Sequence, residues 1–219
     1  MKKGLISVTA IIMLLSTPCF CGQEIIKKEL IEQIKASCGH SYPYDLMLKF
    51  VVEGTGGFDT AVGRFEATDI ESEALLNSFH DFLKPQVKFI DLGSGDGRVV
   101  FLAALFGAKA YGIEYDTRLV DISRKAQEGL KDVIETNKVN FIQGDFLKHD
   151  LSQYDIMYLC AGTNTLLELI KKVVEEIKPG GVFISLYPDE EEIKYNSLTL
   201  IRSYKDKGNI VNVYQKARK

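Results

Sequence analysis

The chain has 219 residues, of which 46% are hydrophobic and 26% are charged, so it can bury a sizeable core as one ordinary globular domain. This length leaves no room for a second catalytic domain. A net charge of -3 supplies no basic field to hold nucleic acid by its phosphates, which disfavours a nucleic-acid partner.

Residues 1–21 have the layout of a signal peptide. Lys2 and Lys3 precede an apolar stretch at 5–15, and Cys19 and Cys21 are small enough for cleavage after Cys21. The apolar stretch is about half of the ~20 residues that a membrane-spanning helix needs. We therefore expect export to the periplasm or the exterior. The alternative is a cytoplasmic protein in which this segment is not a functional signal, because it forms a helix packed on the domain or follows a misplaced start codon.

Residues 22–67 are predicted to form an N-terminal helical region and a loop. Residues 23–36 carry an apolar stripe with helical spacing, and residues 45–52 form a second short apolar helix. The glycine-rich run at 53–57 indicates a flexible loop. Residues 58–65 have no clear period and are either a lid over a ligand or a surface connection.

Residues 68–219 alternate between helix and strand. Thr68 and Glu71 have the spacing of a capping box and predict a helix that starts there. Two strands flank Asp206-Lys207-Gly208 as a C-terminal hairpin. We predict an α/β, doubly wound, Rossmann-like sheet with N-terminal helices, five parallel strands and this antiparallel hairpin. The expected parallel strands end at Asp91, Glu114, Gln143, Leu159 and Leu186.

The turn after the first strand is unusually rich in glycine. Gly93, Gly95 and Gly97 lack Cβ atoms, so the backbone can adopt positive φ and approach a ligand closely at the start of the next helix. The spacing is Gly-x-Gly-x-Gly, whereas a dinucleotide fingerprint requires Gly-x-Gly-x-x-Gly, and Arg98 occupies the place of its third glycine. A simple turn between a core strand and a helix is the alternative.

The charge of this turn favours a cationic ligand. Asp91 ends the strand and Asp96 lies inside the turn, so a pyrophosphate would meet carboxylates at close range. This disfavours an NAD-dependent oxidoreductase. S-adenosylmethionine (SAM) carries a sulfonium and an ammonium charge and no phosphate, so it suits the turn.

These residues resemble the first motif of the class I SAM-dependent methyltransferases, a hydrophobic strand that ends in Asp-x-Gly-x-Gly-x-Gly. Glu114 ends the second strand, where a carboxylate can accept hydrogen bonds from ribose hydroxyls. Asp145 matches the family's Gly-Asp motif, whose acid accepts from the adenine amino group, and Lys178-Pro179-Gly180-Gly181 matches its turn before the fifth strand. The resemblance implies SAM as cofactor, bound by Glu66, Asp91, Gly93, Ser94, Gly95, Gly97, Glu114, Tyr115, Asp145 and Phe146.

A finer resemblance is to the Dot-type, non-SET protein-lysine methyltransferases and their small prokaryotic relatives. It rests on residues 64–68, 91–95, 99–100 and 144–147, and it implies that Glu66 holds the methionine end of SAM. The chain departs from that family at Leu159-Cys160-Ala161, where the family has Val-Asn-Asn, and it has no basic nucleosome-binding tail. Both departures disfavour a histone-like substrate.

The resemblance places the methyl acceptor above the fourth strand. We predict Tyr158 and Asn164 as catalytic residues, with a core residue and a helix cap as the respective alternatives. Phe58, Phe65 and Glu66 are expected to close the pocket. No Asn-Pro-Pro-Tyr or Asp-Pro-Pro-Tyr marker for a base or amide acceptor is present. Cation-π and charge attraction favour an amine acceptor.

The predicted function is therefore methyl transfer from SAM to an amine or another nucleophile, possible acceptors including a protein lysine. The alternative is an exported, non-catalytic protein of the same fold that binds SAM or another adenosine ligand; how SAM would reach an exported protein is open. No metal site is expected, because the three histidines are isolated. After cleavage Cys38 and Cys160 are left, as one disulfide or as two thiols.

Overall fold

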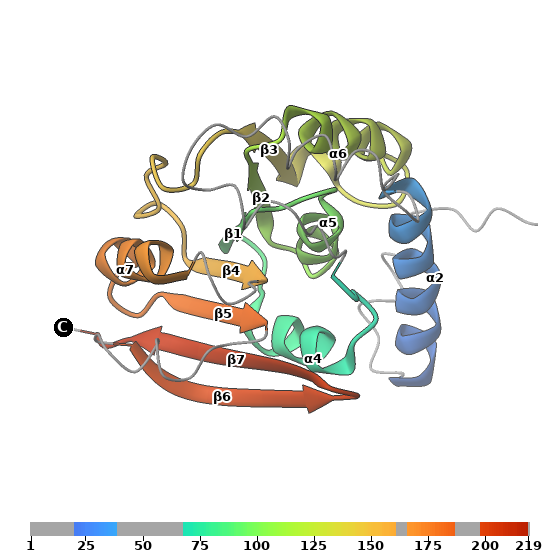
Figure 1. Cartoon of the computed structure of the whole chain (residues 1–219). Helices are drawn as coiled ribbons and strands as arrows, with labels where there is room; N and C mark the ends of the chain where they lie inside the picture. Colours follow the sequence, from blue (N-terminus) through green and yellow to red (C-terminus); the bar gives the residue numbers. More distant parts are fainter. Residues whose placement is uncertain (1–19, 39–67, 161–165, 187–197, 219) are drawn as a thin grey trace, which may run out of the picture.

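The computed structural model of the protein describes residues 20–38, 68–160, 166–186 and 198–218. Its described strands form a seven-stranded sheet in the order β3-β2-β1-β4-β5-β7-β6, with helices on both faces (Figure 1). The strands are β1 Lys88–Leu92, β2 Lys109–Glu114, β3 Val139–Gln143, β4 Ile156–Cys160, β5 Val182–Leu186, β6 Leu198–Asp206 and β7 Asn209–Lys216. The helices are α2 Phe20–Cys38, α4 Glu73–Phe82, α5 Arg98–Leu105, α6 Thr117–Gly129 and α7 Leu166–Glu176, with a 3-10 turn at Thr136–Lys138.

The sheet topology confirms the predicted fold class. Strands β1 to β5 pair in parallel, whereas β7 runs antiparallel to β5 and β6 antiparallel to β7. From β1 the chain passes outward to β2 and β3, then crosses back to β4 on the other side of β1. Ligands of such sheets bind outside the strand carboxyl ends at this reversal of strand order. We therefore expect a ligand to bind at the turns that follow β1, β2, β3 and β4.

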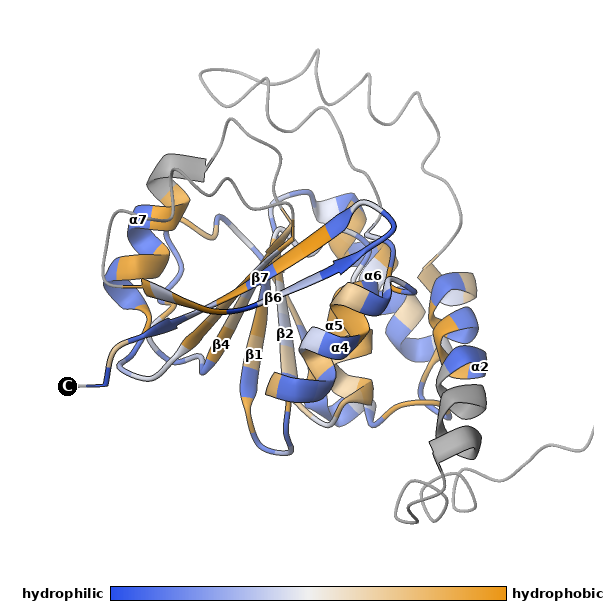
Figure 2. Ribbon diagram, turned by 90° about the horizontal axis from the view of Figure 1, so that it is seen from below, coloured by the Kyte–Doolittle hydropathy of each residue, from blue (hydrophilic) through white to orange (hydrophobic). Residues whose placement is uncertain are grey.

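Two apolar clusters cover the two faces of the sheet. One contains Phe79 of α4 and Phe89 of β1 with apolar residues of α2, α5 and α6; the other contains Met157 of β4 and Val173 of α7. Figure 2 shows the apolar strands between α7 on one side and α2, α4, α5 and α6 on the other. Successive strand residues face opposite clusters, as the two-residue period of a strand requires.

Helix α2 confirms the predicted amphipathic N-terminal helix and extends it at both ends. Ile31 and Ile34 are buried in the same cluster as the sheet, and the helix contacts α5 and α6. Lys35 forms an ion pair with Glu71, with Nζ and Oε2 2.7 Å apart. The proposed cleavage after Cys21 falls in the first turn of α2. Residues 1–19 and the second predicted N-terminal helix lie outside the described residues. No helix in the described ranges is long and apolar enough to cross a membrane.

The predicted capping box at Thr68 is wrong. Helix α4 begins at Glu73, with Ser72 as its N-cap residue. The Oδ1 of Asp69 instead accepts from the backbone N-H of Glu71 at 3.0 Å, which holds a turn before the helix. The N-H of Glu73 donates to Oδ2 of Asp206, 3.1 Å away in the hairpin. The start of α4 is thus capped by a tertiary contact that sequence spacing does not reveal.

Candidate functional site

The glycine turn joins β1 to α5 and is fastened to the end of β2. The backbone N-H groups of Gly93 and Ser94 donate to the carbonyl of Ile113 at 2.9 and 3.0 Å, and Gly97 N-H donates to Ser94 O at 2.9 Å. All three predicted glycines have positive φ: 82° at Gly93, 53° at Gly95 and 83° at Gly97. The turn therefore has the left-handed backbone that glycine favours.

Two of these glycines serve different purposes. A Cβ on Gly97 would lie 2.6 Å from Cζ of Phe141 and 3.0 Å from Oγ of Ser123, so α6 and β3 pack directly against the turn. A Cβ on Gly93 would meet no atom of the described residues within 4 Å. Gly97 thus permits close packing behind the turn, and Gly93 leaves its front open to a ligand.

Glu114 links the end of β2 to the turn. Its Oε2 accepts from the backbone N-H of Gly95 at 3.0 Å, and its Oε1 accepts from the N-H of Asp116 at 2.9 Å. Burial raises the pKa of Glu114, and these backbone donors partly offset that effect. The carboxylate is therefore held in place before any ligand arrives.

Asp91 lies deeper, at 3% exposure. Burial raises the pKa of its carboxyl well above the usual range, and the nearby Glu114 and Asp96 raise it further. A cation placed beside Asp91 would favour its charged form, whereas a phosphate would oppose it. The site is thus suited to a positively charged ligand, as the turn sequence indicates.

Tyr115 and Asp145 lie at the adjoining ends of β2 and β3. The Gly144 N-H donates to Glu114 O at 2.9 Å, and Gln143 Nε2 donates to Tyr115 O at 3.2 Å. Tyr115 is 63% exposed, which leaves its ring available to a flat ligand. The Asp145 Oδ1 accepts from the N-H of Leu147 at 2.9 Å, so this acid also caps its own turn.

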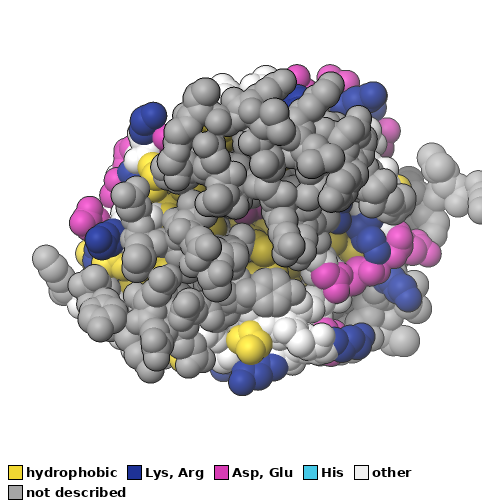
Figure 3. All heavy atoms as spheres, viewed as in Figure 1, with side chains coloured by type: hydrophobic (Ala, Val, Ile, Leu, Met, Phe, Trp, Pro, Cys, Tyr) yellow, Lys and Arg dark blue, Asp and Glu magenta, His cyan; other side chains and the backbone are white. Residues whose placement is uncertain are grey.

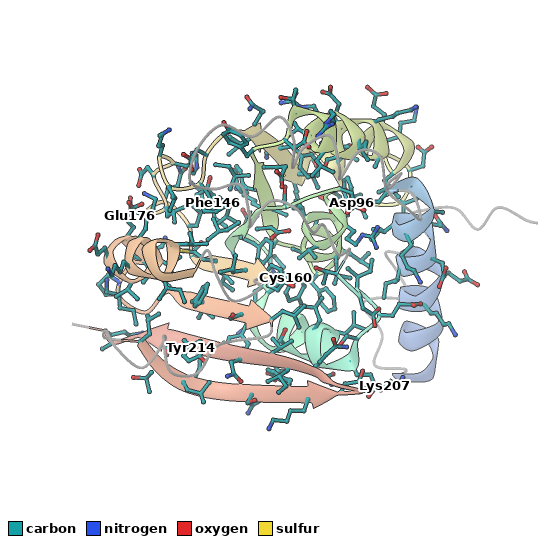
Figure 4. The ribbon with its side chains drawn as sticks, in the orientation of Figure 1. Asp96, Phe146, Cys160, Glu176, Lys207 and Tyr214 are labelled. Atoms are coloured by element: carbon teal, nitrogen blue, oxygen red, sulfur yellow. The ribbon has the colours of Figure 1, made fainter. Side chains whose placement is uncertain are left out.

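Ser94 and Phe146, two of the predicted cofactor-binding residues, also pack against other parts of the protein. Ser94 is 6% exposed, and its Oγ would lie only 2.6 Å from a Cβ on Gly112, so its side chain faces β2. Phe146 packs against the cluster on the α7 side of the sheet, and Figure 4 labels its position. Their contacts with a cofactor stay predictions. Glu66 lies outside the described residues.

The predicted acceptor residues are placed only in part. Tyr158 has no exposed surface, and its ring packs edge-on against Phe79 and beside Phe89, with centroids 5.9 and 6.2 Å away. This is the core position that we stated as the alternative, and the catalytic role stays a prediction. It is also the register partner of Asp91. Asn164, Phe58 and Phe65 lie outside the described residues.

The sequence also led us to expect no metal site and two remaining cysteines. Within the described ranges no group of histidine, cysteine and acidic residues is arranged to hold a metal ion. Cys38 is buried at the end of α2, whereas Cys160 is exposed at the end of β4 (Figure 4), and no disulfide joins the two. This is the two-thiol alternative.

On the face of the molecule seen in Figure 3, hydrophobic side chains show near the centre and charged side chains around the rim.

Our sequence reasoning missed two Asp-x-Arg pairs next to the site. Asp96 pairs with Arg98 at the start of α5, and Asp116 pairs with Arg118 at the start of α6. In both, the acid also accepts from the arginine's backbone N-H, at 3.2 and 2.9 Å. The signal in the sequence is the repetition of Asp-x-Arg at the start of the helices that follow β1 and β2.

Comparison with protein families adds independent information. The family model of the ANTKMT methyltransferase domain matches residues 91–188, from the acid of β1 to just beyond β5, which is less than half of the chain. The ribosomal protein L11 methyltransferase of Listeria innocua is 26% identical over 178 residues, covering 77% of this chain and 54% of its own length. A protein-lysine N-methyltransferase of Saccharolobus islandicus is 31% identical over 97 residues, covering 43% of this chain and 58% of its own.

The chain spans about half the length of these curated relatives. Among solved structures, an RNA methyltransferase from Salinibacter ruber in complex with S-adenosyl-L-homocysteine (SAH) has a TM-score of 0.56 and 26% sequence identity. The match covers 67% of this chain and 93% of that one. The fold of this chain thus resembles one that is known in complex with the demethylated form of SAM.

Proposed function

We propose that this chain, a class I SAM-dependent methyltransferase, transfers a methyl group to the side-chain amine of a lysine in a protein. The observation that carries the proposal is the pairing of an open glycine turn with the buried acids Asp91 and Glu114. SAM, the cofactor of this fold, supplies a methyl group on a positively charged sulfur. The residues at the turn fit a ligand of that charge, and their carboxylates would repel a pyrophosphate.

The donor side of the site would use groups that are already in place. Glu114 is held by two backbone N-H groups, so it can accept from ribose hydroxyls with little reorganisation. Asp91 would stabilise the positive charge of the ligand, and Tyr115 would cover a flat ring. Because these groups need little movement on binding, the cost of ordering the site is small.

Two observations support a protein lysine as the acceptor. The Saccharolobus relative is named as a protein-lysine methyltransferase and the Listeria relative acts by name on a ribosomal protein, although each match covers only part of the relative. The acidic site would also attract a basic side chain. The acceptor amine must reach the site without its proton and in line with the methyl group, so positioning supplies most of the catalysis.

The test has two stages. Calorimetry with SAM, SAH and NAD on the full chain should give binding of the first two and none of NAD. Methyl transfer should then be measured on lysine-containing peptides, with the same peptides carrying arginine in place of lysine as the control. Lysine-dependent transfer supports the proposal. SAM binding with no transfer to any peptide or amine would favour the non-catalytic binding protein of the same fold.

We also propose that the chain is exported and that residues 1–21 are removed. The basic start and the short apolar stretch support this. Mass spectrometry of the protein from its native host should find a chain that starts near Gly22. An intact Met1 in a cytosolic fraction would contradict it and favour the cytoplasmic alternative.

A further inference from the structure

The Asp96–Arg98 pair is the more deeply buried of the two Asp-x-Arg pairs. The Asp96 and Arg98 side chains are 1% and 13% exposed, whereas those of Asp116 and Arg118 are 13% and 40% exposed. The Nε of Arg98 lies 3.0 Å from both carboxylate oxygens of Asp96, and Nη2 of Arg98 also donates to Oδ2 of this carboxylate. The guanidinium therefore grips this carboxylate as a planar fork, which a lysine could not reproduce in full.

The pair also lies where the glycine turn meets the N-terminal helix. Burial raises the pKa of the Cys38 thiol at the end of α2, Asp96 raises it further and Arg98 lowers it, so both charges act on that helix end. Figure 4 shows Asp96 between α5, α6 and α2. The carboxylate of Asp96 is thus turned to the back of the turn, and Gly93 is at its open front.

Three acids share this small region, and only two of them have a partner among the described residues. Glu114 accepts from backbone N-H groups, and Asp96 accepts from Arg98. The carboxylate of Asp91 has no hydrogen bond or ion pair to any described residue, and its electrostatic neighbours are the other two acids. Of these three carboxylates, Asp91 alone is left to receive the charge of a cationic ligand.

We propose that Arg98 is a positioning residue for the methyl donor: by gripping Asp96 it holds the glycine turn in the form that receives SAM and keeps this acid from competing for the ligand's charge. The proposal rests on SAM binding at this turn, as proposed above. Without Arg98, a nearly fully buried carboxylate would lose its cation. The turn would then shift to bring Asp96 to water, and the N-H of Gly95 would move away from Glu114.

The test compares SAM affinity, measured by calorimetry, with the unfolding temperature in four variants of the full chain. Arg98→Gln should weaken SAM binding roughly ten- to hundredfold, because the loss of one buried charge partner disorders the turn. Arg98→Lys keeps the charge without the fork and should recover part of that affinity. The matched control, Arg118→Gln, breaks the more exposed pair and should change the affinity by less than about threefold.

The fourth variant separates positioning from stability. Asp96→Asn combined with Arg98→Gln leaves no unpaired buried charge, so most of the lost unfolding temperature should return. The affinity should stay low, because the fork that fixes the turn is gone. Affinity that returns in step with the unfolding temperature, or an Arg98→Gln variant that binds SAM normally, would overturn the positioning role. A parent chain that does not bind SAM would overturn the proposed function instead.

Discussion

Single carboxylates decide the chemistry of this site through their surroundings. Glu114 and Asp116 are two residues apart, yet burial raises the pKa of Glu114, whereas the hydrogen bonds from Arg118 outweigh burial and lower the pKa of Asp116. Asp91 is buried among acids, and its pKa is raised most strongly. The same functional group is thus an anchored acceptor at Glu114, a helix cap at Asp116 and, as we propose, the group at Asp91 that receives a ligand's positive charge.

Glu114→Ala should weaken SAM binding about ten- to hundredfold. It removes a charge-assisted ribose contact of roughly 1.5 to 3 kcal/mol and leaves the N-H groups of Gly95 and Asp116 without their acceptor. Calorimetry measures the change. Glu128→Ala, on the exposed side of α6, is the control and should bind normally. Unchanged SAM affinity in Glu114→Ala would refute the cofactor role of Glu114.

Asp91 should make the ligand-free protein less stable as the pH rises. Its folded-state pKa is above its unfolded value of ~4, so the folded state holds an extra proton whose stabilising effect is lost between that pH and the folded-state pKa. Asp91→Asn should therefore raise the unfolding temperature near pH 7 and weaken its decline with pH. Glu114 titrates in the same direction and keeps part of the slope.

Asp116→Asn is the matched control for that measurement. The folded-state pKa of Asp116 is lowered, so its carboxylate stabilises the fold above ~pH 4 and this contribution disappears as the pH falls. Asparagine still caps α6, which limits other effects. Unfolding temperatures between pH 3 and pH 8 should therefore change in opposite senses in the two variants. The same sign in both would contradict our assignment of the charges.

Secondary-structure elements are positioned here by contacts at their ends. Helix α5 begins directly after Gly97, whose missing Cβ allows Phe141 of β3 to pack against the turn. Helix α4 begins where the hairpin residue Asp206 accepts the N-H of Glu73. Both starts depend on residues far away in the sequence. Element boundaries near the site are therefore tertiary features.

Gly97→Ala should destabilise the fold by about 2 to 5 kcal/mol. The new methyl group would be strained by the φ of 83° and would lie 2.6 Å from the Phe141 ring. Gly208→Ala is the matched control, because its φ is 91° but its Cβ would meet nothing within 4 Å. It should cost only about 1 to 2 kcal/mol of backbone strain. Urea unfolding measures both, and equal losses would contradict the packing argument.

At the scale of the whole molecule, the N-terminal helix is part of the same core as the sheet. Ile34 of α2 has no exposed surface, and it shares its cluster with Phe89 of β1 and Phe101 of α5. The end of α2 also reaches the Asp96–Arg98 pair behind the glycine turn. We therefore expect α2 to unfold together with the sheet and to stay with the domain after any cleavage of the first residues.

Ile34→Ala should lower the free energy of unfolding by about 2 to 5 kcal/mol, the range for a large aliphatic side chain removed from a core. Gln33→Ala, on the exposed side of the same helix, should have little effect. Circular dichroism and intrinsic tyrosine fluorescence should follow one coincident transition in both variants. An early, separate loss of helical signal in Ile34→Ala would show that α2 is an independent appendage.

The sequence alone determined the features that depend on local spacing. Alternating helix and strand patterns predicted the parallel sheet and its hairpin, because burial imposes periods of 3.6 and 2 residues on the chain. The glycine spacing and the acids at Asp91, Glu114 and Asp145 predicted a site for a cationic adenosine ligand at the strand ends. The structure brings the first two acids and the turn together, and it places Tyr115 and the Asp145 turn at the adjoining ends of β2 and β3.

Only the tertiary structure decided which side chains lie at the glycine turn and which are buried in the core. Tyr158 has a polar hydroxyl group, as a catalytic residue would, but Phe79 of α4 packs against its ring. Such packing between segments that are distant in the sequence cannot be predicted from local residue spacing. The first residue of α4 was likewise set by Asp206, more than a hundred residues later. The sequence has the same Asp-x-Arg spacing at Asp96 and at Asp116. Only the three-dimensional structure shows that the Asp96–Arg98 pair is the more deeply buried of the two.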